Sequence, residues 1–306
     1  MKPSLTPLRY PGGKGWLLDY VQRFIRKNTL EISEIVEPYA GTAAVSIGLL
    51  KSDMVQEAII CESDYLITSF WNAVKYKLFD FVESVKSIEI SMETWYSLRK
   101  YLDENPPANS NVVEVATAFL FFNRTNYSGI INAGPIGGKS QKSVYSLGCR
   151  FNKERIIKRL LDLEPVMGMV KVIQGDGLQF MEKIVSDRKL EKPLFYVDPP
   201  YYYAGKELYR DYFDDDNHRE LASFLLDLKY PWLLSYDDAD FIKELYKDTK
   251  NAQIYTDYQA NKLKDKEKEL LISNKVIPPG SSPVNFKYTP VVNLKYIRSA
   301  GSLGLN

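Results

Sequence analysis

The stretch Val36-Glu37-Pro38-Tyr39-Ala40-Gly41-Thr42-Ala43-Ala44 predicts a strand that turns at a glycine and continues as a helix. The glycine lets a ligand approach the backbone, and the helix N-terminus offers free N–H groups. Glu62 ends the next predicted strand, where an acid can bind both hydroxyls of a ribose. Because the pyrophosphate pattern G-x-G-x-x-G is absent, NAD and FAD are disfavoured. A nucleoside without phosphates, such as S-adenosylmethionine, fits better; the alternative is an ordinary turn with a surface glutamate.

Outward from this stretch, short apolar runs alternate with helix-like patterns, which is typical of an α/β fold with a largely parallel sheet. The predicted strands cover 35–36, 58–61, 170–173, 194–197, 232–236, 252–258 and 270–273. The helices predicted after most of these strands cover 43–51, 66–77, 178–185, 217–228 and 240–246. Residues from 76 to 165 break this rhythm and predict a mostly helical insertion, with helical patterns over 92–102, 112–122 and 152–163. The lysine- and acid-rich stretch 261–269 predicts an exposed loop, and the tail from Pro278 an edge element.

Composition excludes several classes of protein. Two cysteines, Cys61 and Cys149, are too few for a disulfide framework, and His218 is the only histidine, which excludes a histidine metal cluster. An apolar run long enough for a transmembrane helix is missing, and the first four residues lack the character of a signal peptide. We therefore expect a soluble, cytoplasmic protein without a metal ion, in one large domain or two smaller ones.

Charge is balanced overall but unevenly distributed. The net charge is +1, from 40 basic and 39 acidic residues. Residues 1–30 and 123–159 are basic, whereas 205–240 is acidic. Such asymmetry can orient a protein on a polyanion, although a mosaic of solvated faces would give the same pattern.

A second glycine-rich stretch, Leu8-Arg9-Tyr10-Pro11-Gly12-Gly13-Lys14-Gly15, precedes a helix predicted to start near Trp16. Backbone N–H groups in such a turn can hold a carboxylate, and the lysine adds positive charge. The spacing of a phosphate-binding Walker loop is absent. The stretch therefore fits either a carboxylate site or a simple tight turn.

The most specific motif is Asp198-Pro199-Pro200-Tyr201, directly after the predicted strand 194–197. Ligands of α/β folds bind at the carboxyl ends of strands. The prolines stiffen the turn, so one carboxylate oxygen and one fixed carbonyl can accept both hydrogens of a planar amine. The tyrosine can stack on the ring that carries the amine. The motif predicts a clamp for an exocyclic amino group; a rigid turn with an aromatic plug is the alternative.

The chain resembles the Dam-like, alpha-group adenine-specific DNA methyltransferases in three motifs and in their order. These are Tyr-Pro-Gly-Gly-Lys at 10–14, Glu-Pro-Tyr-Ala-Gly at 37–41 and Asp-Pro-Pro-Tyr at 198–201. Residues 123–129 are similar to that family's Asn-Arg-x-x-Tyr-Asn-Gly segment, and 149–152 and Ser235-Tyr236-Asp237 also fit its layout. The resemblance implies a Rossmann-like, S-adenosylmethionine-dependent methyltransferase fold with a mostly helical inserted recognition domain. It places the catalytic domain at 1–75 and 166–306 and the target-recognition domain at 76–165.

The resemblance also implies roles for the matching residues. Those that would bind the cofactor are Tyr10, Gly12, Gly13, Lys14, Glu37, Pro38, Tyr39, Gly41, Glu62, Asp176, Gly177 and Asp198. Among them, Glu62 would hold the ribose and Asp176 the adenine of the cofactor. Those that would hold the target adenine, flipped out of double-stranded DNA for direct in-line transfer, are Asp198, Pro199 and Tyr201. Those that would contact DNA are Arg9, Arg124, Tyr127, Asn132, Lys139, Lys142 and Arg150.

Two departures from the family pattern matter. The usual Gly-x-Gly of the cofactor loop is Gly41-Thr42-Ala43 here, and we expect alanine to be tolerated because it is small. The arginine that reads a guanine in GATC-specific members is Asn132 here, which argues against GATC as the target.

Two alternative functions remain open. One is methylation of another amine, in cytosine, RNA or protein; the other is a degenerate methyltransferase fold that binds DNA or senses the cofactor. The intact Asp198 motif favours an active adenine methyltransferase, which we expect to be a monomer in the cytoplasm of a prokaryote or a virus-infected cell.

Overall fold

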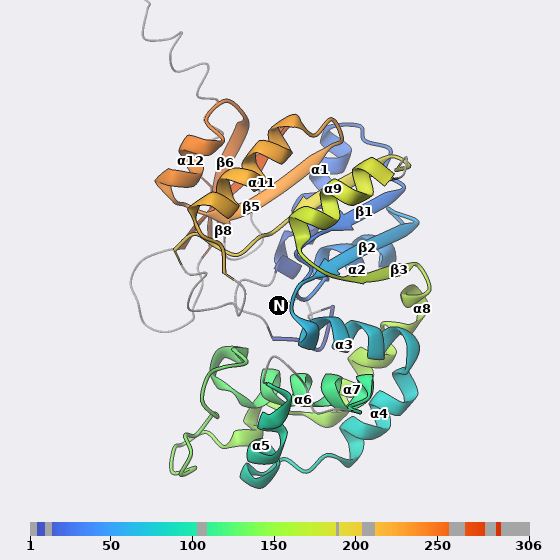
Figure 1. The fold of residues 1–306 in the computed structure, drawn as a ribbon, viewed down its shortest axis with the longest axis vertical. Helices are drawn as coiled ribbons and strands as arrows, with labels where there is room; N and C mark the ends of the chain where they lie inside the picture. Colours follow the sequence, from blue (N-terminus) through green and yellow to red (C-terminus); the bar gives the residue numbers. More distant parts are fainter. Residues whose placement is uncertain are drawn as a thin grey trace, which may run out of the picture. The chain divides into compact units, whose positions relative to one another are not determined.

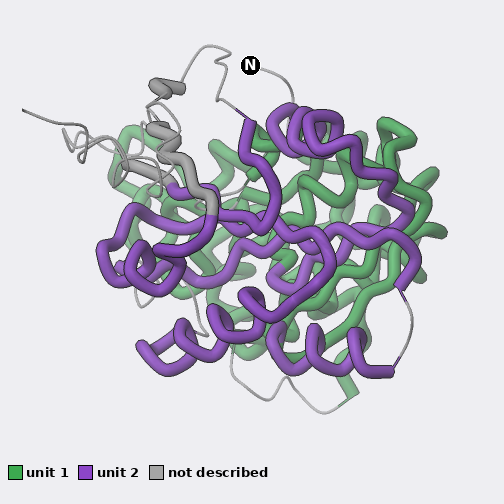
Figure 2. The backbone as a smooth tube through the Cα atoms, turned by 90° about the horizontal axis from the view of Figure 1, so that it is seen from above, with its two compact units in different colours: residues 1–18, 40–176 green, residues 19–39, 177–306 purple. Residues whose placement is uncertain are grey.

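Contacts between residues divide the chain into two compact units, which Figure 2 colours separately. Unit 1 consists of Met1–Leu18 and Ala40–Asp176, and unit 2 of Asp19–Tyr39 and Gly177–Asn306. In this computed structural model the described residues are 5–9, 14–102, 109–187, 190–203, 212–256, 267–278 and 286–288. Only the backbone is described at 250–256, 267–269 and 286–288.

Unit 2 contains a mixed sheet with the strand order β1-β4-β5-β7-β6-β8. β1 (Glu34–Glu37), β4 (Pro193–Val197) and β5 (Trp232–Asp237) are parallel, and β7 (Glu267–Ser273) is antiparallel to β5 and to β6 (Lys250–Thr256). β8 (Phe286–Tyr288) pairs with β6 at the edge. All of β1 and β4 is buried, as is typical of parallel strands covered on both faces. Because Val197 pairs with Leu234, Asp198 and Ser235 follow side by side along the two strands.

The helices of unit 2 are α9 (Gly177–Asp187), α11 (Asp215–Asp227), α12 (Asp240–Leu245) and α1 (Leu18–Lys27), which begins at the last residue of the first segment of unit 1. α9 (yellow) and α11 (orange) lie in front of the strands of this unit in Figure 1. α11 begins at a capping box, in which Asp214 and Asn217 each accept the backbone N–H of the other. It buries His218, Leu221, Ala222 and Leu225, the spacing of one helix face.

In unit 1, β2 (Glu57–Glu62) and β3 (Val170–Gln174) are parallel neighbours, with Glu62 opposite Gln174. The short helix η1 (Lys14–Leu17) lies against α2 (Ala44–Lys51), which is buried from Ala44 to Leu50. α3 (Tyr65–Tyr76) begins after Asp64, whose side chain accepts the N–H of Leu66. Glu62 is therefore the last residue of β2, and Asp176 lies two residues beyond the end of its neighbour β3.

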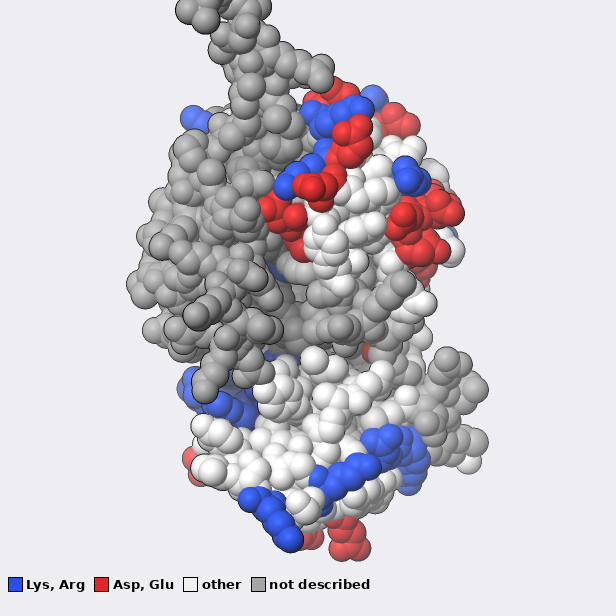
Figure 3. All heavy atoms as spheres, turned by 90° about the vertical axis from the view of Figure 1, so that its left-hand side faces the viewer, with Lys and Arg blue, Asp and Glu red and all other residues white. Residues whose placement is uncertain are grey.

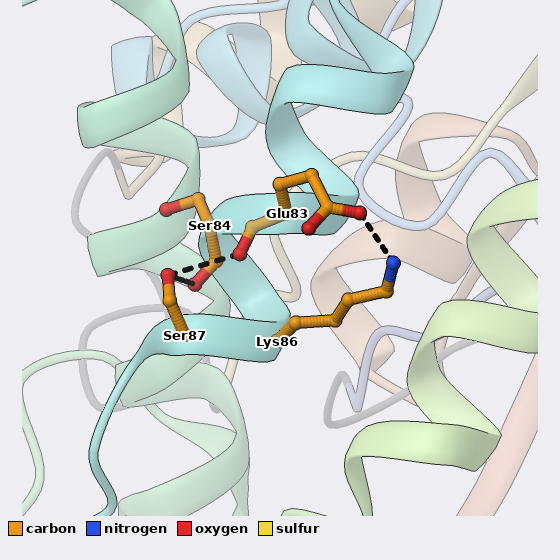
Figure 4. Close-up of polar contacts among 4 residues, drawn as sticks. All are labelled: Glu83, Ser84, Lys86 and Ser87. Atoms are coloured by element: carbon orange, nitrogen blue, oxygen red, sulfur yellow. Dashed lines mark hydrogen bonds and ion pairs between the residues drawn. The ribbon is translucent and has the colours of Figure 1, made fainter.

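Between β2 and β3 the described chain is mostly helical. Besides α3, the elements are α4 (Leu78–Ser87), α5 (Met92–Leu98), η2 (Arg99–Tyr101), α6 (Val112–Thr125), η3 (Tyr127–Gly129), η4 (Leu147–Arg150), α7 (Lys153–Leu161) and α8 (Glu164–Met167). α6 is buried from Val115 to Thr125 and contacts α3, α4 and α5. Figure 4 shows an exposed pair on α4, Lys86 with Glu83, beside Ser87, whose hydroxyl donates to the Glu83 carbonyl. Such exposed pairs contribute little to stability, so the buried face of α6 holds this part together.

These elements confirm the predicted α/β fold and the mostly helical insertion. Sequence analysis missed α4, because only Lys77 separates it from α3 and the two helical patterns merge, and it missed the single turn of α8. Part of the predicted loop 261–269 lies outside the described residues, and its last residues belong to β7. The predicted domain boundaries stay a prediction. The two compact units divide the chain at other positions, after Leu18, Tyr39 and Asp176. No helix in the described part is long and apolar enough to cross a membrane.

Candidate active site

The Asp198-Pro199-Pro200-Tyr201 motif directly follows β4, next to the end of β5. Ser235 of β5 is buried, and its hydroxyl donates to Oδ1 of Asp198 over 2.7 Å. Pro199 is buried, whereas Asp198 and Tyr201 are half-buried. The carboxylate is thus oriented at the strand ends where α/β folds bind ligands.

β5 also holds the residues that follow the motif. Asp237 accepts the N–H of Tyr202 over 3.0 Å and the N–H of Tyr203 over 2.8 Å. Burial raises the pKa of the Asp237 carboxyl, although these two donors act in the opposite direction. The Tyr202 ring stacks on Phe241 with 4.9 Å between centroids, while the Tyr203 side chain is exposed.

The single histidine belongs to an aromatic cluster in unit 2. His218 is buried among the rings of Tyr202, Phe213, Tyr236 and Phe241. Its Nδ1 lies 2.6 Å from the Tyr236 hydroxyl. Burial lowers the pKa of the imidazole to about 4, so His218 is neutral at neutral pH. Through its contact with Tyr236, it packs against β5. No group of three or more His, Cys, Asp or Glu side chains within the described residues could hold a metal ion.

The predicted cofactor-binding turn covers residues 37–41, and its first part, 37–39, lies in unit 2 at the end of β1. Glu37 and Pro38 are buried, and Tyr39 is half-buried. A Cβ atom added to Gly177 would come 2.6 Å from the Pro38 oxygen and 2.5 Å from Cε1 of Tyr39. The close approach of the turn after β1 to the start of α9 therefore requires a glycine at position 177.

The second part of the turn lies in unit 1 with Glu62. Gly41 has a φ of 46°, and its N–H donates to Oε2 of Glu62 over 2.9 Å. Oε1 of Glu62 accepts the N–H groups of Ser63 and Asp64. Burial nevertheless raises the pKa of Glu62 to about 7. An ionised carboxylate has about four acceptor sites, and the three backbone donors leave about one of them for a ribose hydroxyl of S-adenosylmethionine.

The other predicted cofactor residues are only partly described. Asp176 is exposed, and Gly175 before it donates its N–H to the Glu62 carbonyl over 3.1 Å. Lys14 is buried at the start of η1. Tyr10, Gly12 and Gly13 lie outside the described residues.

Side chains near the end of α6 shape the loop that follows it. Asn123 is fully buried: its Oδ1 accepts the N–H of Arg9 over 2.8 Å, and its Nδ2 donates to the carbonyls of Arg9 and Gly129. Asn126 accepts the indole N–H of Trp95 over 2.7 Å. Gly129 has a φ of 80°, and a Cβ there would come 2.7 Å from the Arg9 oxygen. Arg9 is thereby attached to the last turns of α6 and, through Asn123, to Gly129.

The predicted DNA-binding residues differ in accessibility. Arg9 is half-buried, and the exposed members are Tyr127, Asn132, Lys139, Lys142 and Arg150. Arg124 is buried, and its Nη1 donates to the Pro7 carbonyl over 3.3 Å. Burial, together with nearby arginines, lowers the pKa of Arg124 to about 10. Figure 3 shows Lys and Arg side chains on the displayed face of the molecule. The exposed members are accessible to phosphates, whereas Arg124 braces residues 5–9.

Three residues gain a role only from these contacts: Asn123, Ser235 and Asp237. Sequence analysis found them inside motifs without assigning them a function. Their partners are 114, 37 and 35 residues away in the sequence, so no local pattern reports the contact. The usable signal was that Ser235 lies near the end of the predicted strand 232–236 and Asp237 directly follows it, as Asp198 follows the predicted strand 194–197.

Comparisons with known proteins agree with the motifs. The model of the family "D12 class N6 adenine-specific DNA methyltransferase" matches residues 10–262. The type II methyltransferase M.CviBI of Paramecium bursaria Chlorella virus NC1A is 25% identical over 271 residues, which cover 85% of this chain and 90% of that protein.

Similarity to solved structures is weak. The rRNA methyltransferase aviRa from Streptomyces viridochromogenes has a TM-score of 0.38 at 10% identity, with 87% of each chain covered. Spermidine synthase from Thermotoga maritima has a TM-score of 0.36 at 13% identity, with 86% of this chain and 60% of that chain covered. Scores this low carry no information on activity.

The family match contains the motifs at 10–14, 37–41 and 198–201 in one span. It extends over most of the chain, as the resemblance predicted. The chain therefore belongs to the D12 class of N6 adenine-specific DNA methyltransferases, and it transfers a methyl group from S-adenosylmethionine to the 6-amino group of adenine in DNA.

Proposed function

We propose that Asp198, Pro199 and Tyr201 hold the target adenine, flipped out of duplex DNA, for direct in-line methyl transfer. The observation that carries this proposal is the half-buried Asp198 carboxylate at the end of β4, oriented by the Ser235 hydroxyl 2.7 Å away. A base inside the stack is out of reach of such a pocket, so it must be extruded at a cost of a few kcal/mol.

The chemistry requires the 6-amino nitrogen to become a better nucleophile, because its lone pair is delocalised into the ring. Bound S-adenosylmethionine supplies the electrophilic methyl group. Asp198 and the Pro199 carbonyl accept the two N–H hydrogens and favour a pyramidal nitrogen in a near-attack geometry. As positive charge develops on that nitrogen, Asp198 stabilises it, while Tyr201 stacks on the ring.

We propose that the cofactor is bound by residues from two strand-to-helix turns and the N-terminal glycine-rich stretch. Glu62, oriented by the Gly41 N–H, binds the ribose hydroxyls, and Asp176 binds the adenine of the cofactor. The remaining proposed members are Tyr10, Gly12, Gly13, Lys14, Glu37, Pro38, Tyr39, Gly177 and Asp198.

For DNA we propose contacts from Arg9, Tyr127, Asn132, Lys139, Lys142 and Arg150, in a target sequence other than GATC. The support is that all of these side chains except Arg9 are exposed and that residues 123–159 are basic. Because Arg124 is buried against Pro7, we now propose that it positions residues 5–9 rather than contacting phosphate.

We also propose that the enzyme acts in restriction-modification, as a metal-free monomer in the cytoplasm of a prokaryote or a virus-infected cell. The support for the first point is the name of the viral relative, a type II methyltransferase. The absence of a metal ion, the monomeric state and the cytoplasmic location are proposed from the sequence.

The test uses radiolabelled S-adenosylmethionine and plasmid DNA that lacks adenine methylation. Wild type should label N6-methyladenosine, and Asp198→Ala should lose transfer while cofactor binding stays largely intact, because Asp198 is one of many proposed cofactor contacts. Asp227→Ala, which removes an exposed aspartate of α11, serves as the matched control. Normal transfer by folded Asp198→Ala, or loss of its cofactor binding through unfolding, would count against the assignment.

A further inference from the structure

We propose that Ser235 and Asp237, at the carboxyl end of β5, are positioning residues for methyl transfer: they fix the two ends of segment 198–203 in the geometry that the target adenine requires. The inference rests on the proposed catalytic role of Asp198. Neither residue needs to touch DNA or the cofactor, because each acts through atoms of segment 198–203.

The first end of the segment is fixed through a side chain. Asp198 and Ser235 follow the paired residues Val197 and Leu234 of two parallel strands. The Ser235 hydroxyl donates to Oδ1 of Asp198 over 2.7 Å and lies 3.3 Å from the Tyr196 hydroxyl. Since Ser235 is fully buried, water does not replace its hydroxyl easily. The contact therefore sets the plane in which the Asp198 carboxylate meets an amino group.

The second end is fixed through the backbone. Asp237 lies two residues beyond Ser235 and thus on the same face of β5. Its two carboxylate oxygens each accept one N–H, from Tyr202 and from Tyr203. Hydrogen bonds to an ionised acceptor are stronger than neutral ones. Asp237 therefore restrains the chain directly after Tyr201, the residue proposed to stack on the base.

The strand that carries both residues is itself well supported. β5 lies between β4 and β7, with Ser235 opposite Leu271 and Asp237 opposite Glu269 in β7. Between them, the Tyr236 hydroxyl contacts buried His218. A strand anchored on both edges and on its opposite face positions an adjoining segment more precisely than a loop would. A misplacement of about 1 Å can lower a rate by about 100-fold, so this precision has kinetic consequences.

The experiment measures single-turnover methyl transfer to unmethylated plasmid DNA, with separate measurements of cofactor and DNA affinity and of the melting temperature. Ser235→Ala and Asp237→Asn should each lower the rate by about 10- to 100-fold and leave both affinities near wild type. Ser235→Cys keeps a similar volume but a weak donor, so it should resemble Ser235→Ala. Asp238→Asn is the control for Asp237, since Asp238 pairs with Lys243 at 2.6 Å.

Rates near wild type in the folded Ser235 and Asp237 variants would overturn the inference, as would rate losses that merely follow the fraction unfolded or that Asp238→Asn reproduces. A slow but folded Ser235→Cys, with unchanged affinities, supports positioning over a volume effect. Asp198→Ala in the same assay separates the proposals: if it is inactive while the positioning variants are normal, only this inference fails.

Discussion

Asn123 offers the sharpest test of how α6 supports residues 5–9 of the N-terminal segment. Its side chain accepts one hydrogen bond from Arg9 and donates one each to Arg9 and Gly129, in a fully buried position. Asn123→Ala removes all three bonds and leaves one N–H and two carbonyls to find new partners. Residues 5–9 precede the glycine-rich stretch proposed to bind the cofactor, so the change reaches that stretch through the chain.

The magnitude follows from the three contacts. At about 1 kcal/mol net for each hydrogen bond, Asn123→Ala should cost about 3 kcal/mol. If the cost appears mainly as release of residues 5–9, cofactor affinity should fall by up to about 100-fold, since about 1.4 kcal/mol corresponds to a factor of ten. Global stability should fall less, because the core of α6 is otherwise intact.

Calorimetric titration with S-adenosylmethionine measures the affinity, and hydrogen exchange over residues 5–9 measures the release. Thr125→Ala is the control, because the Thr125 hydroxyl donates to the Phe121 carbonyl within the same helix. Wild-type affinity and wild-type exchange in a folded Asn123→Ala protein would refute the reasoning. An equal loss in Thr125→Ala would show a general effect of cavities in α6.

Two further predictions concern the cofactor turns. Burial raises the pKa of Glu62 to about 7, and ribose hydroxyls favour its ionised form, so cofactor binding near pH 7 should release about half a proton and weaken as the pH falls further. Calorimetric titration in buffers of different ionisation enthalpy measures the number of protons released. Proton release that persists in Glu62→Gln would contradict this prediction. Gly177→Ala places a methyl 2.5 Å from Tyr39 and 2.6 Å from the Pro38 oxygen, so it should destabilise the protein by about 1–3 kcal/mol in urea unfolding. Gly168→Ala, with nothing within 4 Å of its added Cβ, should cost less, and equal losses would refute the steric argument.

The departure at Ala43 shows where a local interpretation was incomplete. Sequence analysis considered only the size of alanine in place of the family's glycine. Ala43 has a φ of 44° and a ψ of 30° at the start of α2, a left-handed conformation that costs a residue with a Cβ about 1–2 kcal/mol. Glycine is favoured there for its conformation as well as for space, and a sequence alone does not report a backbone angle.

The sequence by itself determined most of the strands and helices, the order of the three motifs and hence the chemistry, because apolar periodicity and turn residues act over a few neighbouring positions. The tertiary structure alone decided that Arg124 is buried, that Asn123 joins Arg9 to Gly129, and that Ser235 and Asp237 hold segment 198–203. Those contacts join residues distant in sequence, and burial such as that of Glu62 sets a pKa through surroundings contributed by several elements. Strand register and packing create these surroundings, and no short stretch of sequence contains them.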